Sequence, residues 1–221
     1  MTLWPKISGL ALDIFFPPIC LNCKSYLEHF ERDNLVCDKC FRAIRIYKTV
    51  FPLGRDITLM AATSYEEPTV KELIHYFKYK RFLKAQDPLG KILINYVKEL
   101  NLKSGGHLIV PIPLHPSKER QRGFNQSEIL AGIVAKYLEL PVSKLLTRAK
   151  KTKSQIDLPQ ELRTENMKDA FQINTSELPL TNQSVILVDD VYTSGATVRE
   201  AVKILRKAGV KEIKVLVLAK T

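Results

Sequence analysis

The chain has 221 residues, of which 45% are hydrophobic and 26% charged, a mixture that excludes collagen-like, mucin-like and wholly disordered proteins. This length predicts one or two domains with enough chain to bury a substantial core. Lys and Arg number 34 against 23 Asp and Glu, which gives a formal net charge of +11. Such an excess favours a polyanionic partner, whether nucleic acid, an acidic membrane surface or phosphorylated small molecules, although many basic proteins bind none.

The N-terminal segment has the features of neither a membrane span nor a signal peptide. No stretch approaches the roughly 20 apolar residues that cross a bilayer. The most apolar run, residues 9–19, contains Asp13, has Pro17 and Pro18 near its end, and lacks a small-residue cleavage site. We therefore expect no membrane span and an intracellular, cytoplasmic protein.

The four cysteines form two Cys-x2-Cys pairs separated by 13 residues: Cys20, Cys23, Cys37 and Cys40. Such pairs can place four thiolates tetrahedrally around one Zn²⁺, and four protein ligands leave no open position for a substrate. The alternatives are two disulfides or four buried thiols, and a reducing cytosol disfavours disulfides. We therefore predict a structural zinc ribbon in an N-terminal module, residues 1–50, followed by a second domain, residues 51–221.

A basic and aromatic helix is predicted after a strand or hairpin at residues 56–65. From Thr69 onward, apolar residues recur at helical spacing: Leu73, Ile74, Phe77 and Phe82. Cations and tyrosines share this segment: Lys71, Tyr76, Lys78, Tyr79, Lys80, Arg81 and Lys84. One interpretation is a solvated helix face with extended lysine side chains. The other is a surface for single-stranded nucleic acid.

The rest of the chain alternates apolar runs with helical patterns. Helices are predicted at residues 88–100, 127–138 and 198–207, and strands at 107–113, 142–147, 170–173, 185–188 and 213–218. Continuous aliphatic strands that alternate with helices indicate a parallel sheet with helices on both faces. The fold class is therefore α/β.

The segment Val185-Ile-Leu-Val-Asp-Asp-Val-Tyr-Thr-Ser-Gly-Ala-Thr197 carries the most specific chemical pattern. A buried strand ends in two carboxylates, Asp189 and Asp190, and ligands of α/β sheets bind outside this end of a strand. The loop Thr193, Ser194, Gly195, Ala196 and Thr197 can surround a phosphate with N–H groups, hydroxyls and the start of the next helix. Two carboxylates beside a phosphate receptor predict a ribose-5-phosphate site. The alternative is an acidic strand end followed by an ordinary Thr193 or Ser194 helix cap.

This segment closely resembles the phosphoribosylpyrophosphate (PRPP) loop of type I phosphoribosyltransferases. The four-cysteine ribbon, Val110-Pro-Ile-Pro113 and Arg122-Gly-Phe-Asn-Gln126 resemble the ComF family of competence proteins, as do Arg148, Thr152, Gln155, Arg163, Asn166 and Ala170-Phe171. The resemblance covers essentially the whole chain. It implies a type I phosphoribosyltransferase fold, with the zinc module where other members carry a substrate-binding hood.

The resemblance also implies roles for individual residues. Asp189 and Asp190, the candidate catalytic residues, would hold the ribose hydroxyls of PRPP, and residues 193–197 would hold its 5-phosphate. The loop after Val110 would approach the pyrophosphate together with Mg²⁺. Arg122 could bind a phosphate through its guanidinium fork, while a surface cap of the next helix by Asn125 is the alternative for this motif.

A second basic run, residues 144–153, contains five cations and no acid. In type I transferases a flexible loop in this region closes over the active site, and a cationic lid would stabilise a leaving pyrophosphate. The alternatives are a solvated basic loop, or a surface that joins Lys118, Arg120 and Arg122 along a DNA backbone.

Two functions are compatible with this sequence. The first is a PRPP-binding protein of natural competence that binds incoming single-stranded DNA in the cytoplasm. By resemblance it would act beside a helicase-like partner, peripherally at the inner face of the cytoplasmic membrane. The second is an active phosphoribosyltransferase of nucleotide or salvage metabolism with an unknown acceptor. The basic stripes at residues 71–84, 120–122 and 144–153 favour the first.

Overall fold

The computed structural model describes residues 17–54, 56–102, 105–150, 160–174, 176 and 183–221. Its main sheet has the strand order β1-β2-β7-β6-β3. The strands are β1 (Phe51–Pro52), β2 (Ile57–Ser64), β3 (His107–Pro111), β6 (Ser184–Tyr192) and β7 (Glu212–Lys220). Strands β2, β7, β6 and β3 run parallel, and only the short edge strand β1 is antiparallel within this sheet.

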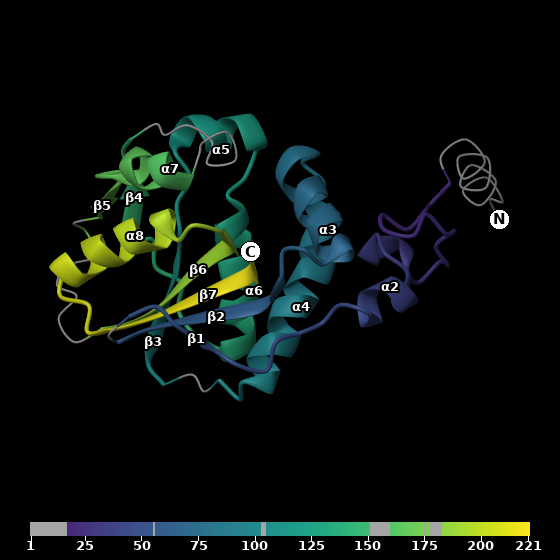
Figure 1. Ribbon diagram of the computed structural model, residues 1–221, viewed down its shortest axis with the longest axis horizontal. Coiled ribbons are helices and arrows are strands. Elements are labelled where there is room, and N and C mark those ends of the chain that lie inside the picture. Colours follow the sequence, from purple (N-terminus) through teal and green to yellow (C-terminus); the bar gives the residue numbers. More distant parts are fainter. Residues whose placement is uncertain (1–16, 55, 103–104, 151–159, 175, 177–182) are drawn as a thin grey trace, which may run out of the picture.

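Helices cover both faces of the sheet, as Figure 1 shows. One face carries α3 (Pro68–Tyr79), α4 (Gln86–Glu99) and α6 (Gln126–Leu138), and the other carries α8 (Ala196–Lys207). Side chains of β6 alternate between two cores: Ile186 and Val188 pack with the α3–α4–α6 layer, and Val185 and Leu187 with the α8 layer. The predicted α/β fold with a mostly parallel, doubly covered sheet is thus confirmed.

Two predicted strands lie outside the main sheet. The predicted strands 142–147 and 170–173 correspond to β4 (Leu146–Arg148) and β5 (Phe171–Ile173), which pair antiparallel with each other as a separate sheet. Val142 makes an isolated parallel bridge to Ile109 and is not part of β4. These two predicted strands therefore do not belong to the parallel sheet, contrary to the expectation for them.

Two short polar helices form where only loops were expected. Helix α5 (Pro116–Arg122) begins with a proline and is capped by the His115 side chain, which accepts a hydrogen bond from the Ser117 N–H. Helix α7 (Gln160–Met167) lies within the long polar stretch after β4. Helix α5 has no buried residue. A helix that buries no face leaves no periodic signal in the sequence.

The cysteine module packs on the α3–α4 layer. It contains the 3-10 helix η1 (Arg32–Asn34) and α2 (Asp38–Arg42), and its buried Leu27 and Val36 belong to the same apolar cluster as the cores of α3 and α4. Asp33 pairs with Lys84 of the 3-10 helix η2 (Leu83–Ala85) at 2.9 Å. In Figure 1, α3 stands between α2 and the sheet. The division at residue 50 stays a prediction.

Among the helices that the structure describes, none combines the length and the apolar character that a bilayer crossing needs.

Candidate functional site

The two predicted carboxylates lie on β6 near its carboxyl end. Strand β6 continues to Tyr192, four residues beyond the end of the predicted run, so Asp189 and Asp190 lie within the strand, where Asp189 pairs with Val217 of β7, and do not begin the loop. Successive residues of a strand point in opposite directions. Asp190 shares the face of Ile186 and Val188 and contacts α3, whereas Asp189 lies in phase with Val185 and Leu187 and accepts a hydrogen bond from Ser127 in the first turn of α6. The site is therefore built from three elements that are distant in sequence.

Asp189 is held by the first turn of α6. Its Oδ1 accepts hydrogen bonds from the Ser127 hydroxyl at 2.9 Å and from the Asp190 N–H at 2.9 Å. Burial and the neighbouring Asp190 carboxylate raise the pKa of Asp189 to about 7, against the opposing effects of Lys78 and Ser127. The environment of Asp189 therefore disfavours its charged form.

Asp190 faces an ammonium group from α3. The Lys78 Nζ lies 2.9 Å from Asp190 Oδ2, and both side chains are largely buried, with exposed fractions of 15% and 8%. This contact lacks hydrogen-bond geometry, so Oδ2 is a buried oxygen without a hydrogen-bond partner in the described part of the chain. A buried acceptor in this state favours a ligand hydroxyl.

The loop after β6 turns sharply at Gly195. Its φ of +74° is left-handed, and a Cβ there would lie 2.4 Å from the Tyr192 hydroxyl oxygen. Helix α8 begins at the next residue and has no side-chain cap on its N-cap residue. Ser194 Oγ accepts a long hydrogen bond, 3.4 Å, from the Ala196 N–H. N–H groups at the start of a helix such as α8 are the kind of donors that hold a phosphate.

The Arg122-Gly-Phe-Asn-Gln126 motif joins this site to α3 and β3. Gly123 ends α5 with a φ of +92°, and Asn125 caps α6 by accepting a hydrogen bond from the Ser127 N–H, as the sequence predicted. The Asn125 amide also donates to the Ile112 carbonyl after β3. The Phe124 ring packs on Phe77 of α3, with ring centroids 5.0 Å apart. The motif therefore does more than cap a surface helix.

Arg122 lies against α3 as well. Its guanidinium carbon is 5.8 Å from the centroid of the Tyr79 ring, and its Nη1 is buried without a hydrogen-bond partner among the described residues. Such a stacked guanidinium is suited to bind an anion through its remaining donors. The predicted role of Arg122 at a phosphate stays a prediction.

Arg148 of β4 is a second buried cation near the acidic pair. Burial lowers the pKa of its guanidinium, and the charge of Asp189 opposes that shift. Its guanidinium lies 5.5 Å from the centroid of the Phe171 ring and donates from Nη2 to the Met167 sulfur at 3.4 Å. Arg148 belongs to the basic run 144–153. Residues 151–153 of this run, which include Thr152, lie outside the described residues, and so does Gln155. The lid therefore stays a prediction.

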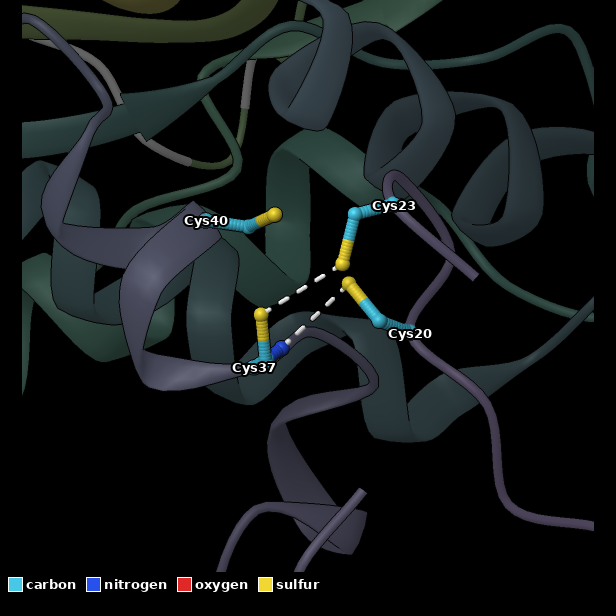
Figure 2. Close-up of side chains that lie close together, drawn as sticks. All are labelled: Cys20, Cys23, Cys37 and Cys40. Atoms are coloured by element: carbon cyan, nitrogen blue, oxygen red, sulfur yellow. Dashed lines mark hydrogen bonds between the residues drawn. The ribbon is translucent and has the colours of Figure 1, made fainter. Parts of the chain in front are cut away.

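The four cysteines come together as the spacing predicted. Their Sγ atoms all lie within 4.8 Å of one another, and Cys23 Sγ and Cys37 Sγ are 3.7 Å apart (Figure 2). Tetrahedral zinc with Zn–S bonds of about 2.3 Å requires sulfur separations of about 3.8 Å.

Backbone and side-chain donors also point at these sulfurs. The Cys37 N–H donates to Cys20 Sγ at 3.4 Å, and the Asn22 amide donates to Cys40 Sγ at 3.5 Å. No disulfide joins the four residues. The set can hold a metal such as zinc.

Two residues of the acidic site were not assigned to it from the sequence. Ser127 was taken only as the start of a helix, and Lys78 as one of several surface cations. A signal for Lys78 exists, because it lies four residues after the buried Ile74 and directly follows the buried Phe77. A lysine on the apolar stripe of a helix is directed toward the protein and away from solvent.

Comparison with known proteins gives the same family for most of the chain. Residues 125–221 match the model of the phosphoribosyl transferase domain. The chain is 30% identical over 217 residues to "Competence protein F" of Haemophilus influenzae, covering 96% of this chain and 89% of that protein. It is 31% identical over 230 residues to "DNA utilization protein YhgH" of Escherichia coli K12, covering 93% and 98%.

More distant matches follow. "Competence protein ComFC" of Streptococcus pneumoniae is 26% identical over 209 residues, with 91% of this chain and 87% of that protein covered. Among solved structures, an allosteric regulatory enzyme of purine biosynthesis is 22% identical with a TM-score of 0.39. That match covers 60% of this chain and 25% of the longer enzyme chain. Together with the whole-length relatives, the domain match shows that this chain belongs to the ComF family and carries its phosphoribosyltransferase domain.

Proposed function

We propose that this protein binds PRPP at the end of β6 and acts in DNA uptake. The observation that carries the sugar-phosphate part is the acidic pair Asp189–Asp190, followed within one short loop by the glycine turn and the start of α8. Carboxylates accept hydrogen bonds from a ribose diol, and helix N-termini bind phosphate.

In this proposal the loop supplies most of the phosphate contacts. The backbone N–H groups of residues 194–197 and the hydroxyls of Thr193, Ser194 and Thr197 bind the 5-phosphate. Asp190 Oδ2, buried and without a hydrogen-bond partner in the described structure, accepts from one ribose hydroxyl. Asp189, held in place by Ser127, accepts from the other.

The carboxylate and hydroxyl oxygens of the site are also suitable ligands for Mg²⁺, which prefers oxygen ligands. Bound with PRPP, Mg²⁺ would neutralise charge on the pyrophosphate. If the protein transfers the 5-phosphoribosyl group, the bond from the anomeric carbon to pyrophosphate breaks, the acceptor bonds to that carbon and releases its proton, and no protein nucleophile is required. The chain residues would then act by positioning the sugar and stabilising the leaving group.

The nucleic-acid part of the proposal rests on α3, on charge and on relatives. Competence and DNA utilization appear in the names of the relatives, and this chain has a net charge of +11. The end of α3 and the residues after it expose aromatic rings, with Tyr79 50% and Phe82 42% exposed, beside Lys80 and Arg81. Bases stack on such rings while cations bind the phosphates. We therefore place single-stranded DNA on this surface, in the cytoplasm, with a helicase-like competence protein as a partner.

Zinc has a structural role in this proposal. With four cysteine ligands it would close the module that packs on α3 and α4, and no coordination position would remain for a substrate. The module thereby supports the helix that carries both Lys78 and the exposed aromatic surface.

Thermal unfolding with and without Mg²⁺ and PRPP tests the sugar-phosphate site. A hundredfold excess of ligand over Kd stabilises the folded protein by about 2.7 kcal/mol, which raises the melting temperature by roughly 5 to 10 °C for a chain of this size. We expect this shift in the wild type and none in the Asp189→Ala, Asp190→Ala double variant. The absence of a shift at millimolar PRPP would refute the site.

The alternative is an active phosphoribosyltransferase of nucleotide or salvage metabolism, which would use the same pocket. Two assays distinguish it from the DNA-uptake function. Binding to a short single-stranded oligonucleotide that weakens steeply with salt supports the DNA-uptake function. Release of pyrophosphate from PRPP in the presence of a defined base, without oligonucleotide binding, supports the alternative.

A further inference from the structure

Lys78 lies outside the part of the chain that matches the phosphoribosyl transferase domain, yet its ammonium reaches the acidic pair of that domain. The matched residues are 125–221, whereas Lys78 is in α3. Its Nζ is 2.9 Å from Asp190 Oδ2, and the side chain is only 15% exposed. An ordinary surface lysine keeps its ammonium in water. The burial of this charge is therefore a feature that the fold maintains.

The helix end that carries Lys78 is fixed in place on two sides. Phe77 packs on Phe124, and Tyr79 lies under the Arg122 guanidinium. Arg122 ends α5, and Phe124 lies in the loop that leads from α5 into α6, whose Ser127 holds Asp189. Lys78 is thus directed at the acidic pair by contacts of its two neighbours.

The ion pair leaves hydrogen-bonding capacity on the Asp190 carboxylate. Asp190 Oδ2 has no hydrogen-bond partner among the described residues, because the ammonium approaches it without hydrogen-bond geometry. A structural salt bridge between buried groups normally satisfies its oxygens with hydrogen bonds. Here the oxygen can still accept a hydroxyl, while the ammonium keeps donors available for another anion.

We propose that Lys78 is a further ligand-binding residue of the pocket, which contacts the pyrophosphate group on C1 of the bound sugar. This inference rests on the proposed function. If Asp189 and Asp190 bind the hydroxyls on C2 and C3, an ammonium beside Asp190 lies within a side chain's reach of a substituent on C1. The 5-phosphate already has its own receptor in the loop before α8. Arg122, whose guanidinium lies 5.8 Å from the ring centroid of the adjacent Tyr79, is a further cation close to this end of α3.

The test compares two ligands that differ only in the pyrophosphate. Mg²⁺ with PRPP and Mg²⁺ with ribose 5-phosphate are titrated calorimetrically into the wild type, Lys78→Met and Lys98→Met. Lys98 is an exposed lysine of α4 whose ammonium lies 5.6 Å from the Tyr137 ring centroid, so this variant controls for the loss of one charge. Loss of one charge-assisted contact weakens binding by about 10- to 100-fold.

We expect Lys78→Met to weaken PRPP binding by that factor and to leave the Kd for ribose 5-phosphate unchanged or lower, because a competing counter-ion has been removed. Lys78→Arg should restore most of the PRPP affinity, and Lys98→Met should behave as wild type. Equal losses for both ligands, or no loss for either, would overturn the role of Lys78 while leaving the proposed function intact. If the wild type binds neither ligand, the proposed function itself fails. If Lys78→Met does not fold, Lys78→Gln gives the same comparison.

Discussion

The turn at Gly195 allows a prediction whose size follows from the structure. Replacing Gly195 by Ala forces a side chain into a left-handed conformation, φ +74°, which costs about 1–2 kcal/mol. The new Cβ would also lie 2.4 Å from the hydroxyl oxygen of Tyr192 and 2.7 Å from its ring carbon Cζ, so the ring must move. Displacing a packed ring from its rotamer adds about 0.5–1.5 kcal/mol.

We therefore expect Gly195→Ala to lower the free energy of unfolding by about 2–3 kcal/mol, or the melting temperature by roughly 5 to 10 °C. PRPP binding should fall with it, because the loop N–H groups are displaced. The matched control is Gly132→Ala. Gly132 is exposed within α6, and a Cβ there meets no atom within 4 Å. This variant should be more stable than wild type by about 0.5–1 kcal/mol.

The two variants are measured by thermal and urea unfolding of the zinc-bound protein. A Tyr192→Ala background should remove the ring collision and leave only the backbone cost of Gly195→Ala. If Gly195→Ala unfolds at the same temperature as wild type, or if the Tyr192→Ala background changes nothing, the account of this loop is wrong.

Three further predictions concern the metal, pH and a surface ion pair. Atomic absorption should find about one zinc per chain, and a chelator should lower the melting temperature; thiol titration that finds two disulfides would contradict this. Because burial and Asp190 raise the pKa of Asp189 to about 7, the folded protein keeps a proton that the unfolded chain has released, so stability should fall as pH rises from about 4 to 7. Urea unfolding at pH 5 and pH 7.5 should show this loss in wild type and a smaller one in Asp189→Asn; equal slopes would refute it. Asp33→Ala removes an ion pair with Lys84 whose two side chains are 76% and 61% exposed, and the melting temperature should stay within about 1 °C.

The sequence was most informative for helices and strands whose buried apolar residues recur at a regular spacing. Helix α3 was expected from Thr69 and begins at Pro68, and α6 was expected from Ser127 and begins at Gln126. The strand at residues 185–188 was found within the longer β6. These elements bury apolar residues at regular spacing, and that spacing is visible in the chain itself.

Helix α5 and the pairing of the short strands β4 and β5 were not predictable in the same way. Helix α5 buries no residue, and β4 and β5 have three residues each, too few for a period. Nothing in three residues tells a strand of the main sheet from one that pairs elsewhere. Their positions follow from long-range contacts that form only in the folded protein.

The same limit applies to the site. The acidic pair and the glycine turn lie in one short segment, and the four cysteines lie within the first 40 residues. Local sequence was therefore enough to single them out. Ser127 reaches Asp189 from 62 residues away along the chain, and Lys78 reaches Asp190 from a different helix. Such pairs depend on how helices pack against strand ends, which local sequence does not specify.

A crystal structure of the zinc-bound protein with Mg²⁺ and PRPP tests the central claim most directly. The account predicts the 5-phosphate at the backbone N–H groups of residues 194–197, the ribose hydroxyls on Asp189 and Asp190, and the pyrophosphate beside Lys78. PRPP bound with its sugar away from the two carboxylates would contradict the account. Crystals grown at saturating PRPP that hold no ligand at this loop would contradict it equally.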